Sequence, residues 1–324
     1  NTHDTNLLKL NILRRDQIWF TEKDDKNGIS DLYPLSDFSV RIQDVAENLI
    51  EEYMLLANET VDKHLTNLGL PCLHRVHDHP NEEKLIVAVN YPFYKYDADD
   101  CVYNPKALQE LAEHIKDTGR LSSVLSTNLV KCMARAKYSP KNIGHSGLAK
   151  ENYCHFTSPI RRYPDLTVHR IIKDCYFDSE HSHRNAKKWE VKLPEIGEHT
   201  SKMERIADEA ESQTLYMRCS EYMSKHIGEE FEGTVIGLSQ RGIQVQLDNM
   251  VEGKVRLRNL NGDYVYNAET FSLVSMDNSE NYYIGDRLLV RVVDANKENK
   301  TIDFKVVSKI EENYIQNSED SNQY

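Results

Sequence analysis

The sequence predicts an α+β protein, in which a mostly helical domain is followed by a five-stranded antiparallel barrel. Two patterns along the chain support this prediction. Apolar residues recur at three- and four-residue spacing over long stretches between residues 42 and 223, which is the period of amphipathic helices. From residue 228 onward, short alternating segments are separated by turns rich in Gly, Asp and Asn, as in a small closed barrel.

Composition places the chain among globular proteins with two or three domains. It has 324 residues, of which 39% are hydrophobic and 28% are charged. Its net charge of −12 argues against non-specific coating of nucleic acid, but allows a basic groove on an acidic body. No apolar run reaches the ~18 residues of a membrane span, and no signal peptide opens the sequence. The six cysteines form no C-x-x-C pair, so we expect a cytoplasmic protein with reduced thiols and without a disulfide framework or zinc ribbon.

The first segment, residues 1–41, differs in character from the rest. Residues 18–20 predict a short buried strand, and Asn27 with Gly28 predicts a turn. The Thr-His-Asp that includes His3 resembles the tail of an AAA/ABC-type ATPase, where a histidine senses the γ-phosphate. Because no Walker A glycine loop occurs in the sequence, ATP binding is not supported. The alternative is an unrelated structural segment or a fusion scar.

Helices dominate the next part of the chain. The apolar spacing predicts one long helix over residues 42–65, which ends before Gly69. Alternation predicts a strand over residues 73–76. Two further helices are expected over residues 105–116 and 122–134.

Two clusters of side chains suggest metal binding. His74, His77 and His79 lie close in sequence, but we find no carboxylate or cysteine that completes a ligand set beside them, so we interpret them as residues of a strand and its loop. Three aspartates over residues 97–100 offer the hard oxygen ligands that suit Mg²⁺. We interpret that cluster as a solvated, turn-forming loop.

A proline-bracketed arginine pair is the strongest functional signal. Ser158 is expected to cap a helix whose first residue is Pro159. Arg161 and Arg162 would then lie in the first turn, beside unpaired N–H groups, where an anion such as phosphate is favoured. Pro164 would interrupt this helix after one turn. The alternative is a surface turn with a solvated arginine pair.

The remaining elements complete both domains. A helix reaches about residue 176, a polar loop is expected over residues 177–192, and a long helix follows over residues 194–223. The polar tail after residue 308 is expected to be disordered. The five predicted barrel strands are residues 231–235, 242–247, 253–257, 282–293 and 301–304.

Three motifs together resemble the RNB exoribonuclease family. They are residues 155–170, residues 142–149 with Tyr153, and residues 49–59. The resemblance covers about residues 42–308. It implies that residues 42–227 are the C-terminal portion of an RNB catalytic domain, that residues 228–308 are an S1-type OB-fold domain, and that residues 309–324 are a tail. The implied activity is processive 3′→5′ hydrolysis of single-stranded RNA to nucleoside 5′-monophosphates, with Mg²⁺ as the cofactor and no DNA or membrane partner.

The resemblance also implies roles for individual residues of the RNB portion. Arg161 would be catalytic, because it would clamp the scissile phosphate and stabilise the developing negative charge. Arg162 and Arg170 would hold the RNA path or pair with Asp165. The RNA-binding residues implied for this portion are Ser158, His155, Arg162, Arg170, and Glu51 or Glu52 on the long helix, with a structural role as the alternative for His155 and solvation as that for the two glutamates.

In the barrel, bases of the RNA would stack on aromatic side chains over a positive surface. Phe231, Tyr264 and Tyr266 are the candidates, with core packing as the alternative for each. Where the family places a stacking phenylalanine, this sequence has Gln244. We therefore expect weakened RNA binding by that face.

The sequence departs from the family at the metal centre. The family holds Mg²⁺ with four aspartates upstream of the Leu-Leu-Ala-Asn-Glu helix, whereas residues 97–100 lie downstream of it, and Tyr91 stands where a further aspartate is expected. We therefore assign no metal ligand. We expect a catalytically incomplete polypeptide that is truncated, fused or chimeric, with a missing N-terminal half as a further partner. The alternatives are an inactive RNA-binding fragment and an ATPase-associated defence protein.

Overall fold

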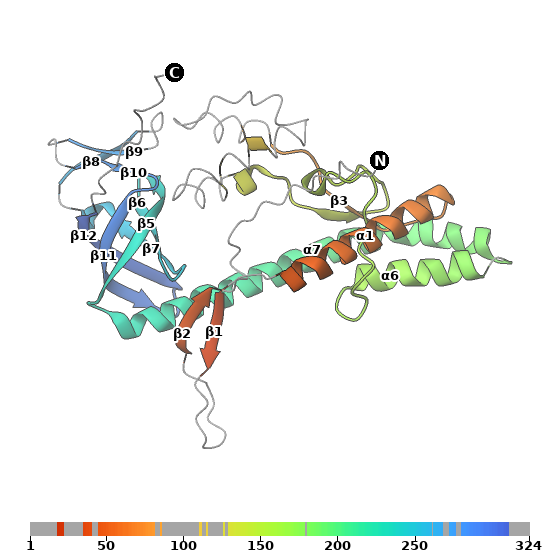
Figure 1. The fold of residues 1–324 in the computed structure, drawn as a ribbon, viewed down its shortest axis with the longest axis horizontal. Helices are drawn as coiled ribbons and strands as arrows, with labels where there is room; N and C mark the ends of the chain where they lie inside the picture. Colours follow the sequence, from red (N-terminus) through yellow and green to blue (C-terminus); the bar gives the residue numbers. More distant parts are fainter. Residues whose placement is uncertain are drawn as a thin grey trace, which may run out of the picture. The chain divides into compact units, whose positions relative to one another are not determined.

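A computed structural model of the chain describes two compact units. The described residues are 18–22, 35–40, 45–81, 85, 110, 111, 115, 126, 129–178, 180–260, 262–267, 272–276 and 280–310. One unit falls within Arg41–Ser212, and the other combines Ile18–Val40 with Gln213–Tyr324 (Figure 1). Within the described ranges, no helix combines the length and the apolar character that a membrane crossing requires.

The predicted long helix is confirmed as α1 (Val45–Asn67). It ends where Gly69 adopts a positive φ of 65°, and the N–H groups of Gly69 and Leu70 turn back to the carbonyl groups of Thr66 and Leu65. This is the Schellman arrangement, in which glycine takes the left-handed position at no steric cost. Its buried residues are Asn58, Asp62 and Leu65, so two of the three are polar.

The predicted strand at residues 73–76 is confirmed as β3 (His74–Val76), which pairs antiparallel with β4 (Lys137–Ser139). The motif that follows β4 contains the short 3-10 helix η2 (Ser146–Leu148). Two helices were predicted between β3 and β4. The described residues of the first, 110, 111 and 115, are helical, and so are those of the second at 126 and 129–132. The aspartates of residues 97–100 lie outside the described residues.

The helix that was predicted to include the arginine pair begins only after it. It is α6 (Tyr163–Ile171), which continues into the π-helical segment η3 (Ile172–Phe177). Ser158 does not cap it: Arg162 occupies the N-cap position with an extended backbone, and no side chain caps the helix. Residues 159–161 form a turn instead, since Pro159 fits a turn as well as a first helical turn. Pro164 lies in the first turn of α6, where its missing N–H costs nothing, so it does not interrupt the helix.

The predicted loop at residues 177–192 was largely wrong. The long helix α7 (Ser182–Met223) starts at Ser182 and contains Pro194. Proline inside a helix removes one backbone hydrogen bond. Ala186 and Leu193 are buried in the same apolar core as Leu65 and Ile171, so tertiary packing outweighs the local preference for a loop.

The predicted barrel is confirmed. Its five strands close in the order β11-β12-β7-β6-β5, which Figure 1 shows in cyan to blue. The β12–β7 pairing is parallel, so the prediction of a fully antiparallel barrel was wrong at this closure. The strands are β5 (Glu230–Ser239), β6 (Gly242–Leu247), β7 (Glu252–Arg256), β11 (Arg287–Asn296) and β12 (Thr301–Lys309). Their inward residues, with Met223 at the end of α7, form one apolar core.

Close packing inside the barrel depends on one glycine. A Cβ added to Gly253 on β7 would lie 2.3 Å from the ring of the buried Phe304 on β12. Any side chain at position 253 therefore competes with this ring for the same space.

Smaller elements lie before and between the barrel strands in the sequence. A three-stranded sheet comprises β8 (Tyr264–Asn267), β9 (Ser272–Ser275) and β10 (Tyr282–Tyr283), whereas the sequence placed Tyr282 in the fourth barrel strand. Two 3-10 helices, η4 (Ser224–His226) and η5 (Leu257–Asn259), precede β5 and follow β7. The predicted strand at residues 18–20 is confirmed as β1 (Ile18–Glu22), which pairs with β2 (Leu35–Val40).

Candidate functional site

Asn58 on α1 fixes the segment that precedes the arginine pair. Its Oδ1 accepts the backbone N–H groups of Phe156 at 2.9 Å and Thr157 at 3.3 Å, and its Nδ2 donates to the hydroxyl of Tyr153 at 3.1 Å. An amide side chain suits this position because it offers both donors and acceptors. Asn58 was not among the site residues predicted from the sequence, although the motif at residues 49–59 contains it.

Asp165 on α6 holds the turn that carries the arginine pair. Its side chain is fully buried, and its Oδ1 accepts the backbone N–H of Ser158 at 2.8 Å and the Arg162 Nη2 at 2.7 Å. The pairing of Arg162 with Asp165, one of the predicted alternatives, is therefore confirmed. Arg161 is exposed beside it. In this way a buried carboxylate orients one arginine while its neighbour stays at the surface.

Three buried polar atoms on this turn have no hydrogen-bond partner among the described residues. They are Thr157 Oγ1, Arg162 Nε and Asp165 Oδ2. A buried polar atom without a partner costs roughly 1–3 kcal/mol. Thr157 and Arg162 therefore each retain a buried hydrogen-bonding group that is unused among the described residues.

A row of rings runs from β3 to the same segment. His77 stacks on His145 with centroids 5.0 Å apart, and the row continues edge to face through Tyr153 and His155 to Tyr138. Burial, and then the charges of nearby arginines, lowers the pKa of His155 to about 2. Burial, and then His77, lowers the pKa of His145 to about 3.

His155 is consequently a neutral ring at physiological pH. Burial raises the pKa of Tyr138, so its hydroxyl keeps its proton. This hydroxyl forms a hydrogen bond with the His155 Nδ1 at 2.8 Å, and the tautomer of His155 determines which group donates. A neutral imidazole cannot bind a phosphate as a cation. Of the two interpretations of His155, the geometry favours a packing role over direct charge pairing with RNA.

Positive charge surrounds His155. Arg162, Arg75 and Arg161 each lower its pKa through their charge. Arg75 donates to Glu204 at 2.6 Å, and its guanidinium lies 4.6 Å from the ring centre of Tyr138. The structure thus brings three arginines near one half-buried ring, of which Arg75 was not anticipated from the sequence.

Other predicted site residues lie farther away. Arg170 is exposed near the far end of α6, with its guanidinium 6.0 Å from the ring centre of Tyr163. Glu51 and Glu52 are half-buried on α1, roughly 9–10 Å along the helix axis from Asn58. They share the helix with the anchor of the site, and their contact with RNA stays a prediction.

The predicted stacking aromatics of the barrel unit are only partly exposed. Phe231, Tyr264 and Tyr266 all pack against the barrel core. Gln244 points outward from β6, opposite Lys254 in the β-sheet register, and donates to Glu252 at 3.1 Å. Many arginines here are paired with carboxylates, for example Arg287 with Glu232 and Asp248. These pairs reduce the positive charge that the barrel offers to RNA.

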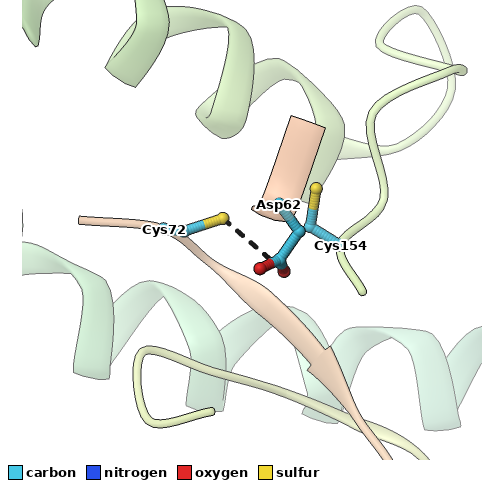
Figure 2. A group of neighbouring side chains, drawn as sticks. All are labelled: Asp62, Cys72 and Cys154. Carbon is cyan, nitrogen blue, oxygen red and sulfur yellow. Dashed lines mark hydrogen bonds between the residues drawn. The ribbon is translucent and has the colours of Figure 1, made fainter. Parts of the chain in front are cut away.

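His74 and His77 have different hydrogen-bond partners. His74 Nδ1 lies 2.7 Å from Asp62 Oδ2, and His77 Nδ1 lies 2.7 Å from the hydroxyl of Ser146. We expected no carboxylate or cysteine to complete a ligand set with these histidines. The structure brings Asp62, Cys72 and Cys154 together next to His74, in a group that includes none of the three histidines (Figure 2). Sequence spacing could not reveal this, since the three residues come from distant segments.

The sequence is similar to known families along most of its length. The RNB domain family matches residues 8–178, and the S1 RNA binding domain family matches residues 224–306. The RNB match leaves only residues 1–7 of the segment likened to an ATPase tail outside it. The domain boundaries at residues 41, 227 and 308 stay predictions.

Individual relatives agree with these matches. Ribonuclease R of Aquifex aeolicus is 40% identical over 272 residues, which are 82% of this chain and 38% of that protein. Ribonuclease R 2 of Lactococcus lactis is 38% identical over 308 residues, which are 92% of this chain and 45% of that protein.

Solved structures share the fold, and one of them illustrates the match. The Mycoplasma genitalium RNase R in complex with ribose methylated single-stranded RNA has a TM-score of 0.80 at 22% identity, and the match covers 93% of this chain and 47% of that one. The chain thus spans less than half the length of each of these relatives. Because the RNB domain matches more than half of the chain, this chain belongs to the RNB family.

Proposed function

We propose that the chain acts in 3′→5′ exonucleolytic turnover of single-stranded RNA in the cytoplasm, as the RNA-holding portion of a ribonuclease R-type enzyme that releases nucleoside 5′-monophosphates. The observation that supports this best is the turn at residues 157–162. There the buried Asp165 orients Arg162, while Thr157 Oγ1 and Arg162 Nε retain hydrogen-bonding capacity. Both groups are hydrogen-bond donors of the kind that bind the anionic oxygens of a phosphodiester.

Arg161 has the role of the phosphate clamp in this proposal. It is exposed next to the fixed Arg162, and no carboxylate among the described residues pairs with its side chain. A guanidinium at the surface can donate two parallel hydrogen bonds to a phosphate and offset charge that develops during hydrolysis. Ser158 supports this arrangement through its backbone, which accepts the N–H groups of Arg161 and Arg162.

The barrel captures the RNA strand in this proposal. Membership of the RNB family and the S1 match support RNA as the class of ligand, and a relative was solved with single-stranded RNA bound. Phe231, Tyr264 and Tyr266 would supply only parts of their rings, because each packs against the core. We infer that the barrel guides the strand, while the arginine turn holds it.

The Mg²⁺ that the family resemblance implies does not fit the described residues. The ligand group that they bring together is Asp62, Cys72 and Cys154, and Mg²⁺ prefers oxygen ligands to thiolates. We therefore derive no step through Mg²⁺. The second candidate function, RNA binding without hydrolysis, is favoured by this mismatch.

Incubation of the chain with 5′-labelled single-stranded RNA and Mg²⁺ separates the two candidates. Progressive shortening from the 3′ end that is abolished in Arg161→Ala, but kept in Arg184→Ala on the exposed face of α7, supports the exonuclease. Binding without shortening, weakened by Arg161→Ala, supports the RNA-binding function. Absence of binding at low salt contradicts both.

A further inference from the structure

The core of the helical unit contains an unusual group of side chains. Asp62 lies on α1, Cys72 lies just before β3, and Cys154 follows Tyr153; all three are buried. Their carboxylate and thiol ligand atoms lie within 4.8 Å of one another. The Cys72 thiol points at the carboxylate of Asp62, with Sγ 3.9 Å from Oδ2 (Figure 2).

We propose that Asp62, Cys72 and Cys154 bind one thiophilic divalent cation, with zinc as the natural occupant. Zinc takes cysteine sulfur and carboxylate oxygen in tetrahedral sites, at roughly 2.3 Å and 2.0–2.2 Å. These bond lengths place a sulfur and an oxygen ligand of a tetrahedral site roughly 3.5–3.7 Å apart. The 3.9 Å separation between the Cys72 sulfur and the Asp62 oxygen is close to that value. The three side chains supply three donor atoms, and a fourth ligand such as water would complete a tetrahedral site.

His74 and Thr66 provide the outer support that a ligating carboxylate needs. His74 Nδ1 lies 2.7 Å from Asp62 Oδ2, and the hydroxyl of Thr66 donates to Oδ1 at 3.2 Å. Such contacts orient a carboxylate toward its metal. The backbone of His74 also forms a β-bridge with Cys154, which links the outer contact to one of the two sulfur ligands.

An ordinary apolar core explains these residues less well. Buried thiols can pack as small apolar groups, but a buried carboxylate beside them carries a large desolvation cost. On metal binding each thiol would release its proton to solvent and donate a sulfur lone pair, so two protons would leave for each ion bound.

The site would tie together the three segments that position the arginine turn. Asp62 follows Asn58 by one helical turn on α1, and Cys154 lies between Tyr153 and His155. The Cys154 thiol also donates to the carbonyl of Asn58 at 3.5 Å. The proposed ion would therefore be structural, and it rests on observations that are independent of the proposed RNA function.

The test uses the full chain, stripped with a chelator and titrated with Co²⁺ and Zn²⁺. We expect one Co²⁺ per chain, with the thiolate-to-cobalt charge-transfer absorption and intense visible bands of a tetrahedral site, and displacement by one Zn²⁺. Cys72→Ser and Cys154→Ser should lose this absorption. Cys175→Ser is the matched control, because Cys175 is buried in the same core cluster but lies outside the ligand group.

Several outcomes would overturn the proposal. The first is that wild-type protein retains its circular dichroism spectrum but binds no stoichiometric Co²⁺ or Zn²⁺. This outcome overturns the proposal without the need for any variant. Equal binding by the Cys72→Ser/Cys154→Ser double variant would also exclude this site. So would a Cys72–Cys154 disulfide, detected by mass spectrometry, as the sole form of protein purified without oxygen.

Discussion

Arg162 donates to the fully buried carboxylate of Asp165 at 2.7 Å, and this ion pair shapes the turn in front of α6. Asp165→Ala would leave a largely buried guanidinium without its partner, and loss of one member of a buried pair costs about 3–5 kcal/mol. We expect a loss of that size in the free energy of unfolding, measured by urea denaturation. Asp178→Ala is the control, because the Asp178–His181 pair is exposed and should contribute no more than about 1 kcal/mol. Equal losses in both variants would contradict the assignment.

Asn58→Ala should destabilise the segment that precedes the arginine turn. The substitution leaves the part-buried N–H groups of Phe156 and Thr157 without their acceptor, at about 1–3 kcal/mol for each unsatisfied group. We expect a loss of about 2–4 kcal/mol in stability and weaker binding of single-stranded RNA in a filter-binding assay. Asn48→Ala, at an exposed position of the same helix, should change stability by less than about 0.5 kcal/mol. Unchanged RNA affinity in folded Asn58→Ala would separate Asn58 from the site.

Stability should fall on acidification because two histidines are buried in the neutral form. The unfolded chain takes up protons near pH 6.5, whereas the folded-state pKa values of His155 and His145 are about 2 and about 3. Between these limits the unfolded state binds more protons, so stability decreases as pH falls from 6.5, by up to about 1.4 kcal/mol per pH unit for each histidine. Urea denaturation at pH 7 and pH 5 should show a smaller pH effect in His155→Gln than in wild type. His181→Gln, at an exposed histidine, should keep the wild-type difference.

Gln244→Phe should tighten RNA binding. Gln244 points outward from β6, opposite Lys254, where an aromatic ring can stack on a base beside a positive charge. A stacked base contributes roughly 1–3 kcal/mol, so the dissociation constant should fall at least about fivefold. The control is Gln246→Phe, two residues along the same strand but opposite Glu252, which should give no gain. If both variants bind like wild type, this face is not the platform.

Salt should weaken RNA binding steeply. For single strands the slope of log affinity against log salt is about −0.7 for each neutralised phosphate. If Arg161 contacts one phosphate, Arg161→Ala should reduce the slope by about 0.7 between about 50 and 200 mM salt. Arg184→Ala should leave the slope unchanged. A flat response of the wild-type chain would argue against a phosphate-binding groove.

Much of the fold could be predicted because it depends on local periodicity. The spacing of apolar residues found α1, α6 and the second half of α7, and the change to alternation found the barrel strands. The errors occur where non-local packing decides. Leu193 and Ala186 are drawn into the core beside α1, so a segment with a loop-like composition becomes helix.

The candidate site was predicted only in part, because local motifs are visible in the sequence and non-local contacts are not. The arginine pair is visible as a motif, but its geometry depends on Asn58, which lies far away in sequence. Likewise, no spacing rule connects Cys72 to Cys154, whose thiols meet only after α1 and β3 have packed together. Sequence patterns therefore identified the arginine pair, whereas the contacts of these residues depend on the tertiary fold.

The contact between Gly253 and Phe304 constrains how this barrel can change over evolutionary time. Because the ring of Phe304 occupies the space of a Cβ at position 253, a lineage can acquire a larger residue at 253 only after the aromatic ring at 304 has been replaced by a smaller side chain. The reverse order passes through an intermediate whose core no longer fits. Substitutions at positions 253 and 304 are therefore coupled, and the change at 304 has to come first.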